Sequence, residues 1–119
     1  MILRAMRTAL ESWAMTQVLE VKTTFARQQD AVEVARKLVA EELCACAQIL
    51  PGLESIYRWE GMLRHDEEVM VLLKTTEERW PALRDRLAAL HPYDTPEIIA
   101  VPVAHASFEY LAWVKENGG

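Results

Sequence analysis

The residues of this sequence that could bind a transition metal are its two cysteines and three histidines. Cys44 and Cys46 lie two positions apart, and their thiol sulfurs suit a soft ion such as Cu(I). His91 lies in a proline-containing connection, where a ring nitrogen can be presented without a place in the core, and imidazole suits Cu(II) and Zn(II). Cys46 and His91 are therefore the candidate metal ligands.

Each candidate ligand also has a purely structural interpretation. A free cysteine in a small apolar stretch is often a buried hydrophobic residue, so Cys46 could belong to the core. His91 could end a helix, where a positive imidazole interacts favourably with the helix dipole. His65 and the acidic residues 66–68 could bind Ca²⁺, Mg²⁺ or Zn²⁺ weakly, or they could form a solvated loop.

Motifs for catalysis are missing from the sequence. It contains no G-x-S-x-G elbow, no glycine-rich phosphate loop and no H-E-x-x-H. Cys46 and His91 could form a nucleophile and base on residue type alone, but the sequence does not fix their separation. We predict a protein that acts by binding rather than turnover, with no obligatory cofactor.

Length and composition restrict the classes of protein further. A chain of 119 residues with 51% hydrophobic and 26% charged residues predicts one folded domain. A net charge of -5 without a cluster of basic residues argues against nucleic acid and anionic membranes as partners. Two cysteines at this spacing on a strand cannot easily form a disulfide, which suits a reducing, cytoplasmic compartment.

Hydrophobic spacing predicts the first strand and two helices. Alternation over residues 18–23 indicates a half-buried strand, and apolar positions three and four apart over residues 28–42 indicate a helix. A T-x-x-E capping box at residues 75–78 predicts the start of a second helix that ends near Leu90, with Pro81 in its first turn. The inward stripe of that helix is expected at Leu83, Leu87 and Leu90.

The middle of the chain predicts a long hairpin. Residues 43–61 form one bent strand, because Pro51 and Gly52 suit a bulge or a sheet edge. The polar residues 64–68 are expected to connect it to a second strand at residues 69–73. That second strand is apolar on both faces, which predicts a central position in the sheet.

A last strand at residues 98–103 and a closing helix complete the predicted fold. Pro102 favours an edge position for the strand, and Ser107 can cap a helix that continues through Val114. The order predicts a βαββαβ unit with a four-stranded antiparallel sheet, helices on one face, and the second and fourth strands at its edges. The uncovered face and the long hairpin suggest association by strand addition, and we expect a trimer.

Five motifs in this order and spacing point to a family: L-C-A-C-A-Q-I-L-P-G, S-I-Y-R-W-E-G, L-K-T-T, H-P-Y-D-T-P-E and Y-L-A-W-V. Together they resemble the CutA family of divalent-cation tolerance proteins. The resemblance implies a domain at residues 15–119 with an α+β, ferredoxin-like fold, in a cytoplasmic homotrimer similar to the PII signalling proteins. Residues 1–14 lie outside it and are expected to form an N-terminal extension with a short helix.

The family resemblance also implies a role in tolerance of copper and other divalent metals. We therefore expect a trimer that binds copper or another divalent cation, with Cys46 and His91 nearest to the ion. Some members of the family have a first-strand cysteine that has been considered for copper binding. Thr23 occupies that position here, which weakens a thiolate site.

Two other functions remain open alongside metal binding. A PII-like signalling trimer could bind a small metabolite or anion in an intersubunit cleft and meet a partner protein through its hairpin. Lys74 favours this function, because an ammonium group repels metal ions. The cleft residues would be Tyr57, Trp59, Lys74, Tyr93 and Glu97. Tyr57 and Trp59 could instead fill the trimer interface, or the trimer could serve only to present its termini.

Overall fold

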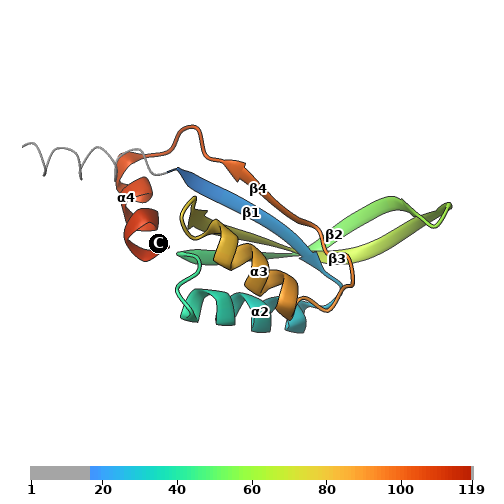
Figure 1. The fold of residues 1–119 in the computed structure, drawn as a ribbon. Coiled ribbons are helices and arrows are strands. Elements are labelled where there is room, and N and C mark those ends of the chain that lie inside the picture. The colour runs from blue at the N-terminus through green and yellow to red at the C-terminus, as the bar shows by residue number, and fades with distance from the viewer. Residues whose placement is uncertain (1–16, 119) are drawn as a thin grey trace, which may run out of the picture.

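The computed structural model describes residues 17–118, so the predicted helix in the N-terminal extension lies outside the described residues. The described chain alternates strands and helices in the predicted order (Figure 1). Its elements are β1 (Val18–Phe25), α2 (Gln28–Ala40), β2 (Cys46–Trp59), β3 (Met62–Thr76), α3 (Trp80–Leu90), β4 (Ile98–Pro102) and α4 (Phe108–Asn117).

The four strands form one antiparallel sheet in the order β2-β3-β1-β4. The second and fourth strands of the chain are therefore the edges, as Pro51 and Pro102 predicted. Edge positions suit proline because its missing N–H removes no hydrogen bond between central strands. The apolar strand β3 is central, which was also predicted.

The core lies between one face of the sheet and the helices α2 and α3, which pack on the same side (Figure 1). Leu83 and Leu87 of α3 are fully buried, as their spacing predicted, whereas Leu90 is only half-buried. Burying one such leucine contributes about 1.5–3 kcal/mol. The core residues from the sheet and α2 are Val21, Phe25, Ala31, Val34, Ala35, Leu38, Cys44, Val69, Val71 and Leu73.

The opposite side of the sheet is partly apolar and partly charged. It is called the helix-free face below because α2 and α3 do not pack on it, although Tyr110 of α4 contacts Cys46 there. Strand register aligns Cys46, Lys74, Glu20 and Val101 in one row across the four strands. The next row on this face consists of Gln48, Leu72, Lys22 and Ile99. Neither α2 nor α3 covers these side chains, because alternate positions along each strand point away from the core.

Strand β2 bends at a bulge between Leu50 and Leu53. Gly52 has a φ of +83°, a left-handed conformation that glycine adopts without steric cost, and Pro51 cannot donate to the ladder. The predicted bend is confirmed. It redirects β2 so that residues 53–68 of the hairpin, called the arm below, extend beyond the ends of α2 and α3 (Figure 1).

The prediction that residues 64–68 form a polar connection was wrong. They belong to β3 and pair with β2, with Arg64 opposite Tyr57 and Glu68 opposite Leu53. The turn is the pair Glu60 and Gly61, both with positive φ (50° and 76°), as a two-residue hairpin turn of the primed type requires. The polar residues of β3 reflect its exposure to solvent beyond the core, not the end of the strand.

The predicted capping box at residues 75–78 was also wrong. Thr75 and Thr76 end β3, and the Thr75 hydroxyl donates to the carbonyl of Leu43 at 2.7 Å. Helix α3 begins after Arg79, which provides no side-chain cap. Two other predictions are confirmed: Pro81 lies in the first turn of α3, and the Ser107 hydroxyl accepts a hydrogen bond from the Tyr110 N–H at 3.3 Å.

Candidate functional site

An open groove of about 900 Å³ lies between the arm and the connection from α3 to β4. Three aromatic residues contribute to its walls: Tyr57 and Trp59 from β2, and Tyr93 from the connection. The bulge in β2 and the turn at residues 60–61 position the arm, and the short strand β4 holds the end of the connection. Residues far apart in the sequence thus meet at one site.

Two tyrosine hydroxyls in the groove bind carboxylates on β3. Tyr57 donates to Asp66 Oδ2, and Tyr93 donates to Glu68 Oε2 at 2.8 Å. The hydrogen bond to Asp66 raises the pKa of Tyr57. Burial is the larger cause, and the hydrogen bond to Glu68 the smaller one, of the raised pKa of Tyr93. Both hydroxyls therefore stay protonated at neutral pH and act as fixed donors towards the carboxylates.

His91 positions the connection that carries Tyr93. Its ring stacks on Phe25 with centroids 4.3 Å apart, and Nε2–H donates to the Thr24 carbonyl at 2.8 Å. Nδ1 accepts the N–H of Tyr93 at 3.1 Å, so both nitrogens have partners only in the neutral Nε2–H tautomer. Burial lowers the pKa of His91, while Thr24, Glu68 and Asp30 oppose that shift.

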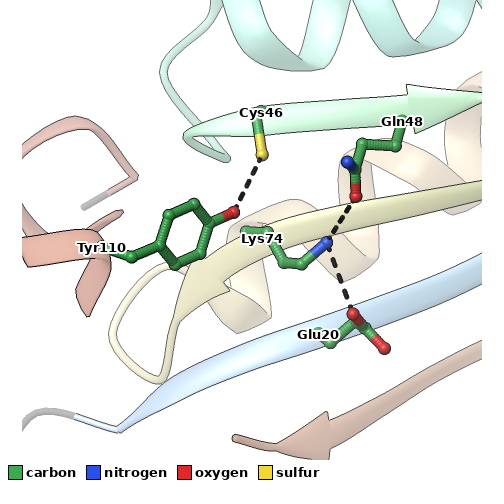
Figure 2. Close-up of polar contacts among 5 residues, drawn as sticks. All are labelled: Glu20, Cys46, Gln48, Lys74 and Tyr110. Carbon is green, nitrogen blue, oxygen red and sulfur yellow. Dashed lines mark hydrogen bonds and ion pairs between the residues drawn. The ribbon is translucent and has the colours of Figure 1, made fainter. Parts of the chain in front are cut away.

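The structure brings four of the five predicted cleft residues to this groove, namely Tyr57, Trp59, Tyr93 and Glu97. Lys74 does not line it. Lys74 lies six positions beyond Glu68 on β3, about 20 Å along the strand. Its Nζ donates to Gln48 Oε1 at 3.0 Å and forms an ion pair with Glu20 Oε2 at 3.3 Å (Figure 2).

The two predicted metal ligands lie apart within one subunit. Cys46 is on the helix-free face, where its Sγ contacts the Tyr110 hydroxyl at 3.7 Å (Figure 2). His91 is on the other side of the sheet against Phe25, and both of its nitrogens are engaged. Among residues 17–118, no group of three histidine, cysteine or acidic side chains is arranged to hold a metal ion.

The remaining sulfur and imidazole candidates offer little metal chemistry. Cys44 is buried in the core, and burial raises the pKa of its thiol to about 12, so the thiolate needed for metal binding is disfavoured. His65 lies on an exposed part of β3 with Nε2 3.1 Å from Glu54 Oε1. It belongs to a strand and not to the predicted loop.

The sequence singled out Asp66 and Glu68 as possible weak cation ligands but did not place them beside the tyrosines of the groove. Both were assigned to a loop, although their spacing of two places them on one side of a strand, the side that Arg64 shares. The signal that could have found them is the Glu60–Gly61 pair, since a turn there makes residues 64–68 pair with 53–57. Within the part of the chain that the structure describes, no helix has the length and apolarity needed to cross a membrane.

The family model and curated sequences similar to this chain point to the same family. The family model of the CutA1 divalent ion tolerance protein matches residues 19–117. The divalent-cation tolerance protein CutA of Thermus thermophilus is 48% identical over 99 residues, which cover 83% of this chain and 96% of that protein. The protein of the same name from Salmonella newport is 42% identical over 104 residues, covering 87% and 90%.

Comparison with solved structures agrees. The divalent cation tolerance protein from Thermus thermophilus superposes with a TM-score of 0.81 at 47% identity and covers 88% of this chain and 100% of its own. CutA1 from Ehrlichia chaffeensis superposes with a TM-score of 0.83 at 30% identity, covering 88% and 98%. The predicted ferredoxin-like α+β fold is confirmed, and the chain belongs to the CutA1 family of divalent ion tolerance proteins.

Proposed function

We propose that this member of the divalent ion tolerance family works as a cytoplasmic, PII-like homotrimer that binds a small molecule in the groove beside the arm. It acts by binding and not by turnover. The observation that supports this function best is the groove itself: about 900 Å³, with aromatic walls and two carboxylates held in place by tyrosine hydroxyls. Concave sites with aromatic walls and a few fixed polar groups are typical of small-molecule binding.

The exposed apolar residues of the arm support the trimer. Leu63 is 78% exposed, Ile56 66% and Met62 64%, and all three lie on a two-stranded ribbon without a core of its own. Ile56 and Leu63 share one face of this ribbon, and Met62 lies on the other. A hairpin of two strands is marginal in water, and exposed apolar side chains that share a face mark interaction sites. A neighbouring subunit of the same chain would supply the missing cover.

The helix-free face supports the same assembly. Ile99 and Val101 expose about half of their surfaces on the edge strand β4. Its outer backbone groups have no strand partner among residues 17–118. Lys74 is only 8% exposed, and Glu20 and Gln48 bind its ammonium group within the subunit (Figure 2). The face could therefore be covered by a neighbour without burying an unpaired charge, which would be costly.

Copper binding is the second candidate function, with a divalent cation as an optional ligand. It is supported by the names of the relatives, which refer to divalent-cation tolerance, and by the partly exposed thiol of Cys46. His91 would have to release Thr24 or Tyr93 before it could bind an ion. Calorimetric titration of Cu(II) tests this function: stoichiometric binding lost in Cys46→Ala and His91→Ala variants would support it.

A thermal-shift screen of small metabolites in metal-free buffer tests the proposed function, because a ligand of the folded state raises the melting temperature. Hits should lose their effect in a Tyr57→Ala, Tyr93→Ala double variant and keep it in Glu33→Gln, a change on the exposed side of α2. Light scattering should give the mass of three chains for each protein. A parallel screen adds divalent metal salts in place of metabolites; shifts from metals with none from metabolites would contradict small-molecule binding and favour the second candidate.

A further inference from the structure

The groove has a strong imbalance of charge. Five of its lining residues are acidic, whereas the guanidinium of Arg64 is the one basic group among its described lining residues. Lys22 forms an ion pair with Glu97 at 3.4 Å and so offsets one of these charges. The acidic residues are Asp66, Glu67, Glu68, Asp94 and Glu97. The groove thus has a negative potential that favours cationic ligands.

The carboxylates of the groove are hydrogen-bond acceptors whose tyrosine donors come from within the protein. The hydroxyl protons of Tyr57 and Tyr93 are directed to Asp66 and Glu68, so neither is available to donate to a ligand. Ionised carboxylates only accept, and each retains lone pairs beyond the one used by tyrosine. A ligand that is rich in donors or carries a positive charge complements these carboxylates.

The aromatic walls add a second, independent feature. Tyr57, Trp59 and Tyr93 come from two separate segments and line the same groove as the carboxylates. The face of an aromatic ring attracts an ammonium or guanidinium group through the ring quadrupole, and tryptophan does so most strongly. Aromatic faces also bind the apolar part of an organic ion, which a bare or hydrated metal ion does not have.

We propose that the ligand of this groove is a small organic cation, an amine or quaternary ammonium compound with an apolar body. This inference rests on the proposed function and names its ligand class. An anion, the other ligand considered for a signalling trimer, is not favoured here, because Lys74 lies outside the groove and forms an ion pair with Glu20.

A metal ion fits the groove less well than an organic cation. Hard divalent ions require several oxygens that converge at short distances. Asp66 and Glu68 each have a tyrosine hydroxyl donor on one oxygen, and the described residues gather no group of three suitable ligands. A diffuse positive charge on a larger ion needs no such convergence.

The test compares choline with 3,3-dimethyl-1-butanol, which has the same shape without the charge. Both are titrated into the full-length wild-type trimer in metal-free buffer, and binding is followed by ligand-observed NMR. We expect choline to bind about tenfold more tightly than the alcohol, since cation–π and carboxylate attraction act on choline alone. Added salt should weaken the binding of choline and leave that of the alcohol unchanged.

Variants place the binding in the groove. An Asp66→Asn, Glu68→Gln protein keeps acceptors for both tyrosine hydroxyls but removes two charges, so its affinity for choline should fall several-fold. Glu33→Gln, which changes the net charge on the exposed side of α2, should leave that affinity unchanged. An equal loss in both proteins would overturn the assignment to the groove.

The other outcomes separate this inference from the proposed function. Equal binding of choline and the alcohol, or binding of citrate in place of both, would overturn the cation class but keep the groove as a small-molecule site. Failure of choline and of spermidine to bind would overturn the inference alone, because the metabolite screen tests the groove separately. Saturable binding of Cu(II) with no small-molecule ligand in either experiment would overturn both.

Discussion

The hairpin of β2 and β3 has two halves in different surroundings. Near the body of the protein, Val69, Val71 and Leu73 of β3 are buried against α2 and α3. In the arm, the same two strands continue past the helices, and Leu63 and Met62 are largely exposed. The strand ladder is continuous apart from the bulge at Gly52, so the two halves differ in packing rather than in backbone pairing.

The two halves of the hairpin are therefore stabilised by different interactions. The body gains stability from burial of side chains within one chain, and that term dominates folding. The arm buries little within one subunit, so we infer that its order and the groove beside it depend on a neighbouring copy. Substitutions in the body and in the arm should therefore have different effects on subunit stability and on assembly.

The body should be the more sensitive half to loss of a buried side chain. Leu83 is fully buried, so Leu83→Ala should lower the free energy of unfolding by about 2–5 kcal/mol. Urea denaturation followed by circular dichroism measures this change. The matched substitution Leu63→Ala in the arm should lower subunit stability much less at concentrations where the protein is dissociated, and an equal loss would contradict the contrast.

A charged substitution in the arm should weaken assembly of the trimer. Leu63→Asp would place an unpaired carboxylate in the proposed interface, at a cost of about 1–3 kcal/mol for each copy, and so weaken association by roughly tenfold or more. Sedimentation velocity over a dilution series measures it. A variant that remains as fully trimeric as wild type would exclude Leu63 from the interface.

The polar network on the helix-free face should matter for stability, since Lys74 is nearly buried. Lys74→Met would leave Glu20 and Gln48 without their shared donor, and we expect a loss of about 1–3 kcal/mol. Adding Glu20→Gln should recover part of the loss in a double-mutant cycle. No coupling between the two substitutions would show that the ion pair contributes nothing.

Acidification should lower stability through His91, with a smaller effect. The ordinary histidine pKa is 6.5, and burial lowers the pKa of His91 in the folded state. The contribution of neutral His91 to the free energy of unfolding is complete above pH 6.5. It is lost as the pH falls towards the pKa of His91 in the folded state, because the unfolded chain binds the proton first. His91→Gln should flatten this part of the pH profile of the urea midpoint.

Much of the body could be predicted from the sequence because its signals are local. Leucines at helical spacing identified the buried side of α3, and Pro51 and Pro102 identified the two edge strands. The β3 half of the arm escaped prediction because it has no core, so no apolar alternation marks residues 64–68 as a strand. The polar side chains of these residues reflect their exposure to solvent. Only the turn at Glu60 and Gly61 fixes how they pair with β2.

The groove was only partly predictable for a related reason. Resemblance to the family indicated Tyr57, Trp59, Tyr93 and Glu97, but it gave no distances and therefore grouped Lys74 with them. Asp66 and Glu68 meet the tyrosine hydroxyls only once the register after the bulge is known. Cys46 and His91 looked like a pair by residue type, whereas the sheet separates them.

The most direct test of whether a neighbouring subunit orders the arm is hydrogen exchange of the arm amides, compared between the wild-type trimer and dissociated Leu63→Asp protein. We expect residues 53–68 to be protected in the trimer and to exchange rapidly in the dissociated subunit, while β1 and residues 69–76 stay protected in both. Persistent protection of the arm in the dissociated subunit would contradict this expectation, because the arm would then be ordered without a neighbour.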